Sequence, residues 1–128
     1  MSTSAVRAEP TVQEPAAEHP TLQRLRITPE MFHRMGAAGI LNDDCKYELL
    51  EGDIYPMPPE GPEHSAERTR IMYRFVLRAS DNWHVRVEAP LSLGDSEPIP
   101  DIALVPGRIE DYEAQHPTTA LLIIEIAY

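Results

Sequence analysis

Two acidic residues, Asp101 and Glu125, stand in apolar surroundings where the local sequence offers no partner. Asp101 precedes the apolar run 102–105, and Glu125 interrupts the apolar run 121–126. An ionised carboxylate in such a setting is costly unless it is paired, hydrogen-bonded or bound to a metal. If the two runs form neighbouring strands, the carboxylates converge and offer oxygen ligands to a hard cation such as Mg²⁺ or Mn²⁺. The open alternative is that Asp101 caps a turn while Glu125 pairs with an arginine.

Two further residues, His64 and Glu48, are candidate catalytic members of the same site. His64 is expected at the start of a helix, where it can contact a phosphate or a carboxylate; a plain surface histidine is an equally open interpretation. Glu48 lies on an expected strand, whose alternation lets its side chain face either a cleft or the solvent. Both residues are therefore secondary to the pair Asp101 and Glu125.

The pattern of the chain outlines the elements that position these residues. Residues 1–25 are rich in Pro, Glu and Ala, which predicts a disordered tail ahead of one domain over 26–128. Turn residues predict a β-hairpin over 47–57, and apolar spacing predicts a helix over 63–78. This helix also carries three arginines at four-residue spacing, Arg70, Arg74 and Arg78. They indicate either a phosphate-facing ridge or a solvated helix face with ion pairs.

Three strands are expected after this helix, over residues 83–93, 99–105 and 119–127. The last of them has an apolar run without alternation, which is typical of a strand covered on both faces. We therefore expect it to lie centrally in a sheet. In that position Glu125 is the residue that most needs a partner.

Composition limits the classes of function. The chain of 128 residues has 11 basic and 21 acidic residues, a formal charge of −10, which argues against tight non-specific binding to DNA unless a metal or a local basic patch intervenes. Cys45 is the only cysteine, so an intrachain disulfide is excluded and a reducing, cytoplasmic compartment is expected. No secretory signal and no apolar run of membrane-spanning length is present, so no membrane partner is expected.

Four segments together resemble the Uma-type restriction endonuclease family of the PD-(D/E)XK nuclease superfamily: residues 47–53, 61–64, 96–105 and 116–127. The resemblance covers about residues 27–127. It implies an α/β, restriction-endonuclease-like fold with a mixed central sheet flanked by helices, truncated after the strand of Glu125. It also implies cleavage of DNA that depends on a divalent metal, Mg²⁺ or Mn²⁺, with Asp101 and Glu125 as the metal ligands.

The sequence departs from the family pattern at the motif lysine. The position two after Glu125 is Ala127, and the family's lysine is instead expected on a helix downstream, beyond the last residue, Tyr128. Loss of one such preorganised donor costs about 10²–10³ in turnover. The chain is therefore expected to be weakly active or inactive, and the alternative function is a non-catalytic remnant or interaction module. An apolar strand without its cover also invites association, so a homo-oligomer is among the expected forms.

Overall fold

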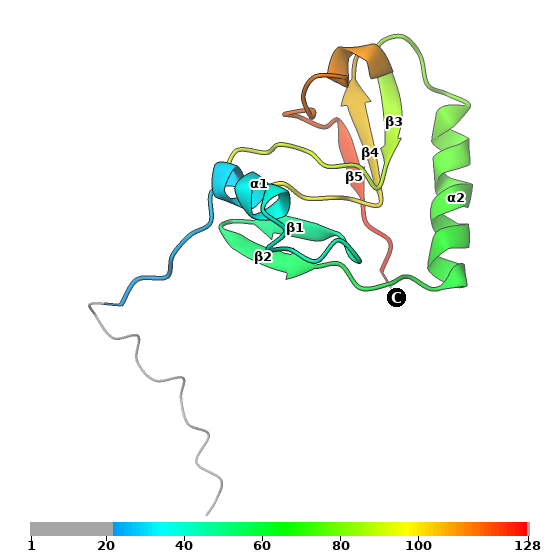
Figure 1. Cartoon of the computed structure of the whole chain (residues 1–128). Coiled ribbons are helices and arrows are strands. Elements are labelled where there is room, and N and C mark those ends of the chain that lie inside the picture. Colours follow the sequence, from blue (N-terminus) through cyan, green and yellow to red (C-terminus); the bar gives the residue numbers. More distant parts are fainter. Residues whose placement is uncertain (1–21, 128) are drawn as a thin grey trace, which may run out of the picture.

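The fold is known from a computed structural model, which describes residues 22–127. The helices are α1 (Pro29–Ala37), α2 (Pro62–Val76) and the short 3-10 helix η1 (Ile109–Tyr112). The strands are β1 (Tyr47–Leu50), β2 (Asp53–Pro56), β3 (Trp83–Val87), β4 (Ile102–Pro106) and β5 (Leu122–Ile124). Helices and strands thus follow one another along the chain, as expected for the predicted α/β class (Figure 1).

The predicted tail, residues 1–25, lies mostly outside the described residues, so its extent stays a prediction. Near its end, Arg24 is described and forms an ion pair with Asp53 on β2. The backbone amide of Ile27 then donates a hydrogen bond of 2.9 Å to the carbonyl oxygen of Gly52. Contacts with the hairpin therefore begin before the first helix.

The helix α1 begins at residues that are typical of a helix start. The Oγ1 atom of Thr28 accepts a hydrogen bond of 3.2 Å from the amide of Met31, and proline occupies the first turn. The helix is tied to a distant part of the chain by His33, whose Nε2 atom lies 2.6 Å from Oε2 of the buried Glu97. This contact fixes α1 beside the segment that leads into β4.

The predicted hairpin is present as the antiparallel pair β1 and β2. Its two-residue turn has positive φ at both positions, 49° at Glu51 and 88° at Gly52. Such a turn matches the right-handed twist of the strands, and it favours glycine because a Cβ atom is strained in this conformation. A Cβ atom at Gly52 would also lie 2.9 Å from the Cβ atom of Arg26.

Replacing Gly52 by alanine is expected to destabilise the protein more than the same change at Gly94. Both glycines have positive φ, but a Cβ atom at Gly94 meets no atom within 4 Å, whereas one at Gly52 collides with Arg26. Overpacking of this kind costs about 1–3 kcal/mol. Urea denaturation of the two variants measures the difference, and equal midpoints would contradict the steric argument.

The strands β3, β4 and β5 form a second sheet in that order, with β4 in the middle. The prediction that the last strand is central is wrong, because in the described part of the chain β5 pairs with β4 alone. Its apolar side chains remain accessible, with Leu122 43% and Ile123 42% exposed. Every strand pair within residues 22–127 is antiparallel, and the strands form two sheets where a single mixed sheet was expected.

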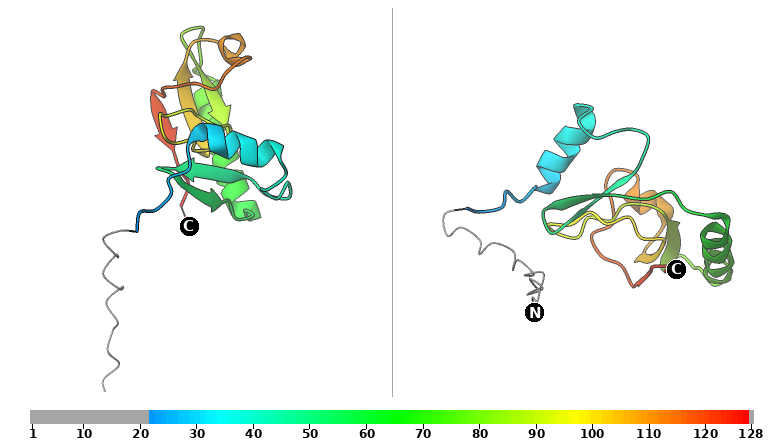
Figure 2. Two further views of the ribbon diagram at one scale, coloured as in Figure 1. Left: turned by 60° about the vertical axis from the view of Figure 1, so that its left-hand side comes forward. Right: turned by 90° about the horizontal axis from the view of Figure 1, so that it is seen from below.

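The core lies on β4, whose residues 102–105 are all buried. Helix α2 packs beside the three-stranded sheet, on the side of β3, and the hairpin lies at the sheet's lower end (Figures 1 and 2). An isolated bridge between Leu49 and Glu97 connects the hairpin to the segment before β4. The start of α2, the hairpin, the start of β4 and the end of β5 therefore meet in one region.

Candidate functional site

A cleft of about 910 Å³ opens where these elements meet. It is bounded by the proline-rich segment 56–62, the first turn of α2 and the residues that follow β5. Its ionisable lining consists of one histidine, His64, and six carboxylates, Glu48, Glu60, Glu63, Glu88, Asp101 and Glu125. This concentration of negative charge identifies the cleft as a candidate site for a cation.

Asp101 and Glu125 lie side by side at one end of the cleft. The pairing of Ile102 with Ile124 between β4 and β5 places the preceding Asp101 next to the following Glu125. The two carboxyl groups share a hydrogen bond, and the amide of Ile126 donates to Oδ2 of Asp101 at 2.9 Å. The structure thus brings together the two residues that the sequence singled out.

The two carboxyl groups differ in acidity. Burial opposes ionisation of Asp101, but hydrogen bonds from the Ile126 amide, His64 and Glu125 outweigh it and hold the pKa of Asp101 below its usual value. Glu125 is exposed as a whole residue, yet partial burial of its carboxyl group and the hydrogen bond with Asp101 raise its pKa from 4.5 to about 7. Near neutral pH, Glu125 therefore carries the proton that the pair shares.

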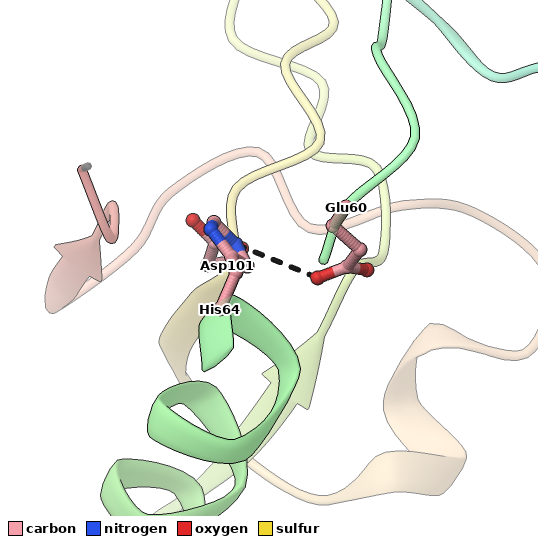
Figure 3. A group of neighbouring side chains, drawn as sticks. All are labelled: Glu60, His64 and Asp101. Carbon is pink, nitrogen blue, oxygen red and sulfur yellow. Dashed lines mark hydrogen bonds and ion pairs between the residues drawn. The ribbon is translucent and has the colours of Figure 1, made fainter. Parts of the chain in front are cut away.

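His64 lies in the cleft and not on the open surface. It stands in the first turn of α2, its side chain is 20% exposed, and its Nε2 atom lies 2.7 Å from Oδ1 of Asp101. The same nitrogen lies 3.5 Å from Oε2 of Glu60 (Figure 3). Nε2 therefore faces the ionised Asp101 and orients that carboxylate.

Glu48 also faces the cleft. It lies on β1, and its Oε1 atom accepts a hydrogen bond of 2.9 Å from the amide of Ile99. Its charge contributes to the raised pKa of Glu125. Of the two orientations that strand alternation allowed, the structure has the one directed toward the site.

Three residues of the cluster were not foreseen from the sequence: Glu60, Arg68 and Glu88. The Nη1 atom of Arg68 forms an ion pair with Glu60, lies 3.0 Å from Oε1 of Glu88, and lies 3.5 Å from Oδ1 of Asp101. The hydrogen bond to Glu60 raises the pKa of Arg68, and the hydrogen bond with Glu60 raises the pKa of Glu88. A signal was present for Arg68, because His64 and Arg68 are four residues apart on α2 and so share one helix face, whereas Glu60 lies in the loop before the helix.

The chemistry of these side chains fits a divalent cation. Glu60, His64 and Asp101 offer three ligand atoms that lie within 4.8 Å of one another. Asp101 and Glu125 offer a second set, in which two carboxyl groups share a proton that a cation could replace. Carboxylate oxygens with at most one imidazole suit Mg²⁺ or Mn²⁺ better than the thiolate-rich sites of softer metals.

The three arginines Arg70, Arg74 and Arg78, of which Arg78 follows the end of α2, have the character of a solvated surface. The Nη1 atom of Arg70 pairs with Oε2 of Glu67 at 2.8 Å, and both side chains are exposed. The Nη1 atom of Arg78 donates to the backbone carbonyl of Arg74 at 2.9 Å. These contacts are the local pairs that a solvated face predicts.

The profile of the Uma2 family, described as "Putative restriction endonuclease", matches residues 29–128. The chain belongs to the Uma2 family. A solved structure, of a "putative nuclease belonging to DUF820" from Anabaena variabilis, is similar to it with a TM-score of 0.53 and 22% sequence identity. The similarity covers 71% of this chain and 50% of that one, so the chain spans about half the length of the nuclease. A search of curated proteins found no match.

Membership of the Uma2 family confirms the resemblance seen in the sequence, and the solved structure confirms the nuclease-like α/β fold. Neither comparison identifies the ligands of a metal. Neither helix α1 nor α2 is long and apolar enough for a bilayer crossing, and the same holds for all helices of residues 22–127. The roles of Asp101, Glu125, His64 and Glu48 stay predictions, and the structure gives their positions in the cleft.

Proposed function

We propose that the protein is a divalent-metal-dependent DNA endonuclease, which hydrolyses phosphodiester bonds in the acidic cleft. The observation that carries this proposal is the contact between Asp101 and Glu125 at the ends of neighbouring strands. Membership of a family described as restriction endonucleases supports DNA as the substrate. The acidic lining supports a cation, because a phosphate would otherwise be repelled by the charge of the cleft.

Asp101 and Glu125 would hold the cation, Mg²⁺ or Mn²⁺. When bound, it would supply charge stabilisation for the phosphate and lower the pKa of a water molecule. Asp101 is kept ionised and oriented by His64 and by the amide of Ile126. Glu125 would be deprotonated when it holds the cation. Glu48, fixed by the amide of Ile99, keeps a further negative charge beside Glu125.

A second candidate function is a non-catalytic interaction module that keeps the nuclease fold. The observation that favours it is Ala127, two residues after Glu125, where the general PD-(D/E)XK pattern has a lysine that assists the attacking water. A missing donor of this kind costs about 10²–10³ in turnover. We therefore expect slow cleavage by this chain, and the experiment below separates slow cleavage from none.

Incubation of the purified chain with supercoiled plasmid DNA and Mn²⁺ tests the function. Slow nicking is expected, and a chelator should stop it because the cation is part of the site. Mn²⁺ should also raise the melting temperature, since a ligand that binds only the folded state stabilises it. The absence of both nicking and a thermal shift would refute the proposal. A thermal shift without nicking would support the interaction module.

Mn²⁺ binding is expected to depend on pH through Glu125. Its folded-state pKa of about 7 exceeds the ordinary 4.5, so the cation must displace a proton below pH 7. Apparent affinity should fall about tenfold per pH unit below 7 and level off above it. Calorimetric titrations at several pH values measure the slope. A Glu125→Gln variant should lose this slope, and a wild-type affinity independent of pH would contradict the assignment.

The same raised pKa gives the metal-free protein a pH-dependent stability. The contribution of Glu125 is fully present below about pH 4.5 and is lost as the pH rises through about 7, since the charged form is disfavoured in the fold.

We place this activity in the cytoplasm, because a lone Cys45 suits a reducing compartment. We also expect copies of the chain to associate through the accessible apolar edge of β5. Light scattering over a range of concentrations measures this association.

A further inference from the structure

Arg68 is a buried cation in contact with carboxylates that line the cleft. It is 9% exposed, on the face of α2 that also presents His64. Its Nη1 atom reaches three carboxylates at once: Glu60, Glu88 and Asp101. An arginine keeps its charge at every pH at which the protein is folded. Three carboxylates of the cleft therefore have a permanent counter-charge beside them before any metal binds.

The contacts of Arg68 divide the carboxylates into two groups. Glu60 and Glu88 share a hydrogen bond with each other and are both paired with Arg68. Asp101 lies between the groups, with Oδ1 toward His64 and Arg68 and Oδ2 toward the amide of Ile126. Glu125 is on the far side, in contact with Asp101. A cation held by Glu60 would have to displace the guanidinium, whereas the ion pairs of Arg68 within the described residues go to Glu60, Glu88 and Asp101 and not to Glu125.

We infer that Arg68 is a positioning residue: it orients Asp101 and occupies Glu60 and Glu88, and so restricts divalent-cation binding to a single site at Asp101 and Glu125. The inference rests on the proposed function, because it concerns the same cation. Of the two possible ligand sets, it favours Asp101 and Glu125 as the ligands of the cation. Glu60 is then the ion-pair partner of Arg68 and not a ligand. Removal of Arg68 should then create a second cation site, since Glu60 and His64 already lie within ligand distance of one another.

The first test leaves Arg68 in place and compares two isosteric changes, Glu60→Gln and Glu125→Gln, by calorimetric titration with Mn²⁺. Because Glu60 pairs with Arg68 and does not bind the cation, Glu60→Gln should keep the affinity for Mn²⁺ within about threefold of wild type. Loss of one ligand commonly costs tenfold or more, so Glu125→Gln should weaken binding at least about tenfold. Equal losses in the two variants would overturn the inference.

The second test counts the Mn²⁺ ions bound per chain, by electron paramagnetic resonance, in wild type and in Arg68→Met. Wild type should bind one ion and Arg68→Met two, because the freed Glu60 and Glu88 regain an acceptor role. Arg68→Lys should return the count to one, since lysine restores the positive charge. The matched control is Arg70→Met, on the exposed side of the same helix, with an unchanged count of one.

The outcomes separate the inference from the function on which it rests. A wild-type count of two, or a folded Arg68→Met variant that still binds one ion, would overturn the inference alone. If Arg68→Met does not fold, the comparison of Glu60→Gln with Glu125→Gln still decides it. The absence of any Mn²⁺ binding by wild type would overturn the inference together with the proposed function.

Discussion

Replacing Asp101 by asparagine is expected to reduce Mn²⁺-dependent DNA cleavage by at least about a hundredfold. Asparagine has the same size and can still accept the hydrogen bond from the amide of Ile126, but it carries no charge to hold the cation. A metal supplies several kcal/mol of charge stabilisation, and each 1.36 kcal/mol corresponds to about a tenfold change in rate. Single-turnover cleavage of a fluorescently labelled duplex measures the loss.

The change at Asp101 must be separated from an effect on folding. Asp101 also contacts His64 and Arg68, so the variant should lose some stability. Circular dichroism and the melting temperature without metal measure that part. The matched control is Asp95→Asn, an exposed aspartate outside the cleft, which should keep wild-type cleavage. Cleavage by a folded Asp101→Asn variant at the wild-type rate would exclude Asp101 as a ligand.

The centre of the site could be predicted from the sequence because the residues around each carboxylate already indicate that it needs a partner. A carboxylate at the end of an apolar run needs a partner, and two such runs in neighbouring strands bring Asp101 and Glu125 together. The hairpin was predictable for the same kind of reason, since Glu51-Gly52 specifies a tight turn by its backbone requirement. Each argument starts from the residues around a single position, and the pairing of β4 with β5 then supplies the contact between the two carboxyl groups.

The rest of the cluster depends on packing between distant elements. Arg68 becomes part of the site only because α2 lies against β3 and directs that face toward the start of β4. Glu88 joins it through a left-handed backbone conformation, φ 47°, directly after β3, and no pattern in the sequence indicates this bend. Helical spacing predicts which residues share a face, but it does not say which face turns inward.

The wrong prediction for the position of β5 in its sheet has a different cause. The apolar run of β5 predicted that both faces of the strand are covered. Such a run shows only that the side chains favour burial. It does not record which segment provides that cover. Within residues 22–127, β4 supplies one edge partner and the apolar side chains stay accessible. The prediction of strand identity was right for residues 122–124, and the prediction of a central position was wrong.

Replacing Ile102 by alanine is expected to destabilise the fold by about 2–5 kcal/mol. The side chain is 0% exposed, on the central strand β4, whose four buried residues 102–105 form much of the core. Alanine would leave a cavity there, because neighbouring strands hold the backbone on both sides and limit collapse. Urea denaturation measures the loss, and a domain of this kind has only about 5–15 kcal/mol to lose.

The control for this change is Ile123→Ala on the adjacent strand β5. The residue type and the substitution are the same, but Ile123 is 42% exposed, so less apolar surface and no enclosed cavity are involved. We expect a loss of less than about 1 kcal/mol. Since Ile102 directly follows Asp101, its variant should also weaken Mn²⁺ binding, whereas Ile123→Ala should not. Equal destabilisation by the two changes would mean that the core of the protein is not centred on β4.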